Sequence, residues 1–293
     1  MSLRLAQVRY LAMTLFCFTA VAVPASASCP ETGQWIWEDG EVRSTTGTME
    51  RIPEGAIVLL GERHGQADDH RWQLQIASAL IGRSDAVTIG YEMFPRQSQP
   101  ALDAWARGEL SEAEFLEQAN WDSHWGMGRE HYMPLFHLNR MNDLPMKALN
   151  LDRDLIRRIG AEGWDGVPEK DRHGVSLPAE PPQAYRDYLR EVYERHPGGD
   201  DNGAGFERFL RSQLAWDRAM AEALDEASGE EGIVIGMVGR GHVRHGLGIP
   251  HQLADLGHER VITMLPETAE GICEQRDELP ATAMFALPAP ADE

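Results

Sequence analysis

The chain alternates continuous apolar runs with stretches whose apolar residues recur at helical spacing. The runs that predict buried strands are 56–61, 86–91, 145–151, 233–238 and 261–265. Between the first two runs, Trp72, Ile76 and Leu80 recur at intervals typical of a helix. Continuous apolar strands separated by helices indicate a sheet that helices cover on both faces. We therefore expect an α/β fold with a mostly parallel central sheet, flanked by helices and connected by right-handed crossovers.

The remaining segments are expected to form further helices, a helical lobe and the two terminal segments. The further helices expected from apolar spacing are 97–106, 111–118, 132–141, 183–196 and 206–227. No strand signal occurs between about 163 and 227, so this part is expected to be an inserted helical lobe. The entry segment 29–54 is expected to hold one short hairpin, and the Pro/Ala-rich tail from Glu278 to fray. Residues 28–293 are expected to form a single domain.

The first 27 residues have the features of a secretory leader. Arg4 and Arg9 precede an apolar stretch over 11–23, and Ala25-Ser26-Ala27 fits the small-residue rule for cleavage. No later segment approaches the roughly 18 apolar residues that a membrane span needs. The sequence therefore predicts a signal peptide over 1–27 and a mature chain in the periplasm or cell envelope.

Two cysteines follow the leader, Cys29 and Cys273. In an oxidising compartment, a disulfide between them is the favoured interpretation. The alternative is a lipid anchor on Cys29, since small residues precede it. However, the usual apolar residue three positions before the cysteine is missing, so a lipoprotein is the less favoured interpretation.

The chain is strongly acidic, with 27 Lys and Arg against 47 Asp and Glu and a formal net charge of −20. Such a surface repels polyanions. Nucleic acid is therefore not expected as a partner.

Two of the predicted strands end in the same pattern of glycine, two residues and histidine. These are Gly61-Glu62-Arg63-His64 and Gly239-Arg240-Gly241-His242. Open parallel sheets bind ligands at the carboxyl ends of their strands, so two histidines delivered there suggest one shared site. Glu92 ends a third strand. The full set of polar residues at strand ends is Glu62, His64, Glu92, Asn150, Asp152, Arg240, His242 and His245.

Imidazole and carboxylate side chains in one cavity are suited to a divalent metal or to general acid–base catalysis. We therefore predict His64, Glu92 and His242 as metal ligands, and the same residues with Glu62 as catalytic groups. A single histidine after a strand is more often a hydrogen-bonded loop residue. The presence of both motifs together with Glu92 shifts the balance towards a site.

The segment 121–137 combines aromatic residues, histidines and methionines. This composition is typical of a packed helical core, which is the favoured interpretation of the segment as a whole. Flat apolar surface beside histidine, tyrosine or methionine is also what haem requires. Tyr132 and His131 are therefore candidate axial haem contacts.

These residues resemble the ChaN haem-binding family, within the wider Tiki/TraB/erythromycin-esterase superfamily. The resemblance extends from about 57 to 266 and rests on two glycine–histidine motifs, an intervening glutamate motif and two shorter matches. In order, they are Gly61–His64, Tyr91–Arg96, Gly108–Leu110, Asn150 and Gly239–His242.

The resemblance implies an exported haem-binding protein of the bacterial envelope that serves iron and haem acquisition. It further implies a homodimer with haem between its subunits, and association with the envelope or an outer-membrane receptor. Other superfamily members are metal-dependent proteases or esterases. By that analogy His64, Glu92 and His242 would be metal ligands or acid–base groups, with Glu62 in support. Haem binding is the first interpretation and a metal-dependent hydrolase the alternative, so whether the protein is an enzyme stays open.

Overall fold

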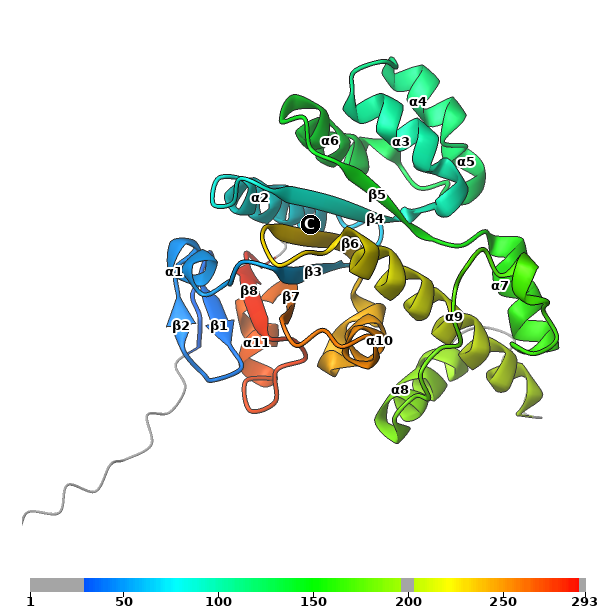
Figure 1. Cartoon of the computed structure of the whole chain (residues 1–293). Coiled ribbons are helices and arrows are strands. Elements are labelled where there is room, and N and C mark those ends of the chain that lie inside the picture. The colour runs from blue at the N-terminus through cyan, green and yellow to red at the C-terminus, as the bar shows by residue number, and fades with distance from the viewer. Residues whose placement is uncertain (1–28, 196–202, 290–293) are drawn as a thin grey trace, which may run out of the picture.

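The computed structural model describes residues 29–195 and 203–289, and these contain one sheet with helices on both faces (Figure 1). The strands lie in the order β2-β1-β8-β7-β3-β6-β4-β5. Their bounds are β1 Trp35–Trp37, β2 Val42–Arg43, β3 Ala56–Glu62, β4 Val87–Pro95, β5 Met146–Asn150, β6 Ile233–Gly239, β7 Val261–Thr268 and β8 Ala283–Leu287.

The six strands from β8 to β5 run parallel, and only β1 pairs antiparallel, with β2 on one side and β8 on the other. All seven residues of β3 and all seven of β6 are buried, as expected for strands covered on both faces. This confirms the predicted α/β class. The predicted hairpin in the entry segment is the β1–β2 pair.

Eleven α-helices surround the sheet in the described part of the chain. Their bounds are α1 Thr45–Glu50, α2 Ala67–Ile81, α3 Gln99–Ala106, α4 Glu112–Gln118, α5 Trp121–His124, α6 Arg129–Met141, α7 Arg153–Glu162, α8 Gln183–Glu194, α9 Ala204–Ala227, α10 Ile249–Asp255 and α11 Ala269–Glu274. Short 3₁₀ turns occur at Arg96–Ser98, Glu169–Asp171, Arg240–His242 and Arg244–Gly246.

The sheet separates two apolar layers. Val58 and Leu60 of β3 pack with α2, α3 and α6 on one face. The alternate residues Ile57 and Leu59 pack with α9, α10 and α11 on the other. Helices α7 and α8 and the first part of α9 extend past the sheet, and no strand occurs between 163 and 227 among the described residues (Figure 1).

The C-terminal tail differs from its prediction. Residues 283–287 form β8, which pairs with β7 and with β1 in the interior of the sheet. Ala283, Met284 and Ala286 have no exposed surface. Fraying was predicted from the flanking prolines and alanines. It is wrong for this segment because two neighbouring strands satisfy its backbone hydrogen bonds, which local composition does not reveal.

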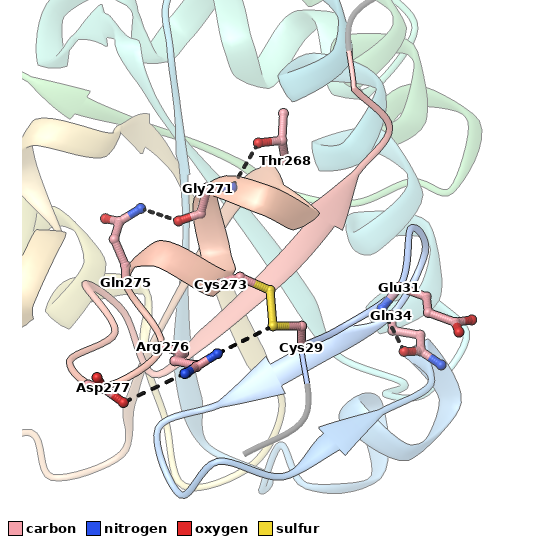
Figure 2. Close-up of a disulfide and its surroundings, with 9 residues drawn as sticks. All are labelled: Cys29, Glu31, Gln34, Thr268, Gly271, Cys273, Gln275, Arg276 and Asp277. Atoms are coloured by element: carbon pink, nitrogen blue, oxygen red, sulfur yellow. Dashed lines mark hydrogen bonds and ion pairs between the residues drawn. A yellow bond between two sulfur atoms is a disulfide. The ribbon is translucent and has the colours of Figure 1, made fainter. Parts of the chain in front are cut away.

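A disulfide joins Cys29 to Cys273, with 5.5 Å between the Cα atoms (Figure 2). It connects the segment before β1 to α11, across a sequence separation of 244 residues. The favoured pairing is thus confirmed, and the sulfur that a lipid anchor would need is already bonded. The predicted signal peptide lies outside the described residues. No helix in 29–195 or 203–289 is long and apolar enough to cross a membrane.

Candidate functional site

The two motif turns and Glu92 meet at the carboxyl edge of the sheet. Glu62 is the last residue of β3 and lies opposite Gly239, the last residue of β6. His64 follows β3, His242 ends the 3₁₀ turn after β6, and Glu92 comes from β4. Two parallel strands that stop in register, with a third beside them, place these side chains around one point.

Glu92 lies at the centre of the group. Its Oε1 is 3.9 Å from His64 Nε2 and 3.7 Å from His242 Nε2. Its Oε2 accepts a hydrogen bond from the backbone N–H of Gly239. A Cβ atom at position 239 would lie 2.9 Å from His64 Cε1, so the glycine of the second motif leaves room for the histidine of the first. The structure therefore brings together the three residues predicted to share a site.

A second carboxylate lies behind each imidazole. Glu62 Oε1 is 2.5 Å from His64 Nδ1, and Asp217 Oδ1 from α9 is 2.6 Å from His242 Nδ1. The hydroxyl of Tyr185 donates to Asp217 Oδ2 at 2.5 Å. Each histidine is thus held by its Nδ1 with its Nε2 facing Glu92, an arrangement that fixes both rings.

The neighbouring carboxylates raise the pKa of His242. Burial alone lowers the pKa of a histidine, but the charges of Asp217 and Glu92 outweigh it and raise the pKa of His242 from 6.5 to about 9. For His64, burial is likewise opposed by Glu62 and Glu92, and the net effect raises its pKa. Burial also raises the pKa of Glu62, against the hydrogen bond from His64.

The predicted divalent-metal site receives no support. Within 29–195 and 203–289, no group of three His, Cys, Asp or Glu side chains is arranged to hold a metal ion. The side chains form hydrogen-bonded and charge pairs instead: both Nδ1 atoms contact carboxylates, and Glu92 Oε1 lies 3.9 and 3.7 Å from the two Nε2 atoms. The sequence motifs place His64, Glu92 and His242 together. They do not reveal Asp217, whose charge raises the pKa of His242.

The raised pKa of His242 predicts a loss of stability at alkaline pH. A base whose folded pKa lies above its unfolded value stabilises the fold fully below the unfolded pKa and loses that effect as pH rises through the folded one. Here the window runs from pH 6.5 to about 9. We expect the free energy of unfolding to fall by about 3 kcal/mol across it, since one pKa unit corresponds to about 1.4 kcal/mol. Urea titrations at several pH values measure this. The His242→Gln variant should show a flatter profile, and an identical slope in both proteins would contradict the assignment.

The two candidate haem contacts, Tyr132 and His131, pack against His70, whose Nε2 lies 3.6 Å from Glu62 Oε2. Tyr132 has no exposed surface, its ring centroid is 4.4 Å from that of His70, and its hydroxyl lies 3.7 Å from Met127 Sδ. The ring of His131 stacks on His70 at 5.6 Å. An axial role for Tyr132 requires the covering residues to move away, whereas His131 is partly exposed.

A cavity of about 1140 Å³ opens beside the Glu92 group. His64, Glu92 and His242 line one part of it. The rest of its wall comes from the ends of β4 and β5, from α5 and the residues on either side of it, from α7 and from α9. The apolar lining residues are Met93, Pro95, Trp125, Met127, Leu151, Ile156, Ala161, Phe209 and Trp216. A large cavity with mostly apolar walls and a few converging polar groups is typical of a ligand site.

Two members of this group could not be recognised from the motifs, Asp217 and Tyr185. Asp217 is fully buried on α9, on the side that it shares with Leu210, Ala221 and Leu224. An acidic residue at an apolar position of an amphipathic helix is a usable signal, because buried carboxylates need a partner. For Tyr185 the sequence has no comparable signal.

Of the other polar strand-end residues, Asn150 and Asp152 line the cavity, and Arg240 and His245 do not. Asn150 donates to the backbone oxygen of Glu92, and Asp152 accepts from the backbone N–H of Asp154 at the start of α7. Arg240 pairs with Glu267. His245 does not line the cavity.

Comparison with known proteins finds a matching family model and a structure with the same fold. A family described as haem-binding uptake, Tiki superfamily, ChaN, matches residues 48–253. A structure of ChaN from Campylobacter jejuni, described as showing cofacial haem binding, aligns with a TM-score of 0.66 and 16% identity over 86% of this chain and 95% of that one.

Two further structures align more weakly. A Bacillus cereus protein has a TM-score of 0.45 and 13% identity over 77% of this chain and 70% of its own. The erythromycin esterase EreC has a TM-score of 0.46 and 14% identity over 79% and 76%. A search of curated protein sequences finds no match. At these identities the ChaN alignment shows a shared fold.

Proposed function

The chain belongs to the haem-binding uptake family, ChaN, of the Tiki superfamily, and from this premise we propose that it binds haem in the cavity beside Glu92. The family match over residues 48–253 carries the proposal. The C. jejuni protein with the same fold is described as binding haem cofacially.

The chemistry of the cavity fits such a ligand. Haem presents a flat apolar ring and two carboxylates, and its iron takes imidazole, thioether or phenolate ligands. Trp125, Phe209 and Trp216 supply flat apolar wall, and Arg153 and Arg208 line the same space without an ion pair in the described part of the chain. These arginines are suited to the two carboxylates.

We further propose that the protein works in the cell envelope, in iron and haem acquisition. The family description as an uptake family supports this role. So does the Cys29–Cys273 disulfide, because such bonds persist in oxidising compartments. A homodimer that shares haem, and an outer-membrane receptor, are the partners that this role would involve.

A hemin titration tests the proposal. We expect a new Soret band that saturates at a defined stoichiometry when the purified protein is titrated with hemin at micromolar concentrations. A matched titration of bovine serum albumin denatured in urea measures nonspecific association. An absorbance that stays equal to free hemin would contradict haem binding.

A second candidate function is acid–base hydrolysis at the same edge of the sheet. It is supported by the two carboxylate–imidazole pairs, Glu62–His64 and Asp217–His242, facing Glu92. Fixed imidazoles beside a carboxylate can move protons to and from a bound water. Ester and peptide substrates should then be cleaved by the wild type and not by the His64→Ala variant. Equal rates in the two proteins would contradict hydrolysis at this site.

A further inference from the structure

Positive charge is scarce in this chain, and most of it is already partnered. The sequence has 27 Lys and Arg against 47 Asp and Glu. Most described arginines contact an acidic side chain, another oxygen acceptor or an aromatic ring. Within residues 29–195 and 203–289, the arginines with no such contact are Arg129, Arg153 and Arg208.

Two of these three arginines line the same cavity. Arg153 is the first residue of α7 and Arg208 lies in the first part of α9, and both belong to the cavity wall. The two helices pack closely there, since a Cβ atom on Gly160 of α7 would lie 3.0 Å from the backbone oxygen of Arg208. Arg129, at the start of α6, does not line the cavity.

The carboxylates of the cavity wall have other partners. Asp154 pairs with Arg157. Asp152 accepts hydrogen bonds from the side-chain amide of Gln97 and from the backbone N–H of Asp154. Glu92 faces the two motif histidines. The wall therefore presents two guanidinium groups that are exposed and that no carboxylate of the described chain neutralises.

The surroundings of these guanidinium groups are apolar. Ile156 of α7 and Phe209 and Trp216 of α9 lie in the same wall. Guanidinium groups bind carboxylate and sulfonate oxygens through charge-assisted hydrogen bonds. A ligand that satisfies both features has an apolar body and at least one negatively charged group.

We propose that this cavity selects ligands that join an apolar body to a negatively charged group, and that Arg153 and Arg208 recognise that group. The inference rests on the proposed function, because both place the ligand in this cavity and haem, with its two carboxylates, is one member of the class. It is independent of which residue, or which subunit, binds the haem iron.

Two fluorescent probes that differ in charge test this selection on the full chain. The probe 8-anilinonaphthalene-1-sulfonate has an apolar body and one sulfonate, and N-phenyl-1-naphthylamine has the same rings without the sulfonate. We expect the Arg153→Gln/Arg208→Gln variant to bind the sulfonate probe about tenfold more weakly and the neutral probe as the wild type does. Added salt should weaken binding of the sulfonate probe to the wild type far more than to the variant.

The third unpartnered arginine supplies the matched control. Arg129→Gln also removes an exposed arginine, but one outside the cavity wall, so this variant should bind both probes as the wild type does. Circular dichroism checks that each variant is folded. The inference is wrong if the wild type does not bind the sulfonate probe, or if the double variant binds it as tightly as the wild type. It is also wrong if the neutral probe, or the Arg129→Gln variant, shows an equal loss.

A parallel hemin titration separates the inference from the proposed function. If the wild type gives no Soret change but binds the sulfonate probe through the two arginines, haem binding fails and the selection for apolar anions stands. If hemin binds the wild type and the double variant equally tightly, haem binding stands and the role of the arginines is wrong.

Discussion

Replacing Asp217 with alanine should lower the free energy of unfolding at neutral pH by about 3–5 kcal/mol, the range for removing one partner of a buried ion pair. Asp217 is fully buried and bonded on both oxygens, to His242 at 2.6 Å and to Tyr185 at 2.5 Å. Without it, His242 must either keep a poorly compensated charge or lose its proton, and the Tyr185 hydroxyl loses its acceptor.

The same helix supplies a matched control. Asp225 also lies on α9 and also pairs with a histidine, His258, at 2.7 Å, but its side chain is 43% exposed. Because exposed ion pairs contribute little, Asp225→Ala should cost about 1 kcal/mol or less. Urea unfolding followed by circular dichroism compares the two. Equal losses would show that burial of the Asp217 pair is not what makes it important.

The substitution should also change the charge of His242. Asp217→Asn keeps the shape of the side chain and removes its charge, so the pKa of His242 should fall from about 9 towards its ordinary value. Nuclear magnetic resonance of the imidazole protons would follow the titration. An unchanged pKa would mean that Glu92, not Asp217, keeps the ring protonated.

The second large effect is expected from the Cys29–Cys273 disulfide, whose removal should lower the free energy of unfolding by about 2–4 kcal/mol. The bond closes a loop across a sequence separation of 244 residues and thereby restricts the unfolded chain. It also fastens the segment before β1, a strand of three residues at the antiparallel end of the sheet. Loss of the bond should therefore loosen β1 and β2 first.

A reductant separates the effect of losing the disulfide from the effect of replacing the two cysteine side chains. Dithiothreitol should shift the urea midpoint of the wild type and leave that of a Cys29→Ser/Cys273→Ser variant unchanged. Hydrogen exchange should be faster in β1 and β2 in the reduced wild type and in the serine variant than in the oxidised wild type. A wild type that is insensitive to the reductant would contradict the expected contribution.

The two glycine–histidine motifs show how far local sequence reaches into the site. Gly61–His64 and Gly239–His242 each follow an apolar run, and parallel strands that end together bring such residues to one edge. Glu92 could be added because it directly follows another apolar run, 86–91. The prediction of a shared location therefore needed only strand positions and the general geometry of parallel sheets.

The chemistry of that location required contacts that the sequence does not show. Asp217 is not part of either motif. It lies on α9, which comes between β5 and β6 in the chain, and it reaches His242 because α9 packs on the sheet. The same packing raises the pKa of His242. In 121–137 the sequence offered Tyr132 and His131 as candidate haem contacts, whereas the structure buries Tyr132 and places neither residue in the cavity wall.

The order of apolar and polar residues by itself determined the α/β class, most strands and helices, the pairing of two distant cysteines and the meeting of His64, Glu92 and His242. All of these depend on periodicity, on local turn residues or on the cellular compartment. Only the tertiary structure decided the interior position of β8, the raised pKa of His242 and the residues that line the cavity. Each of these depends on the burial of a group and on neighbours distant in sequence, because solvation and charge act through space and not along the chain.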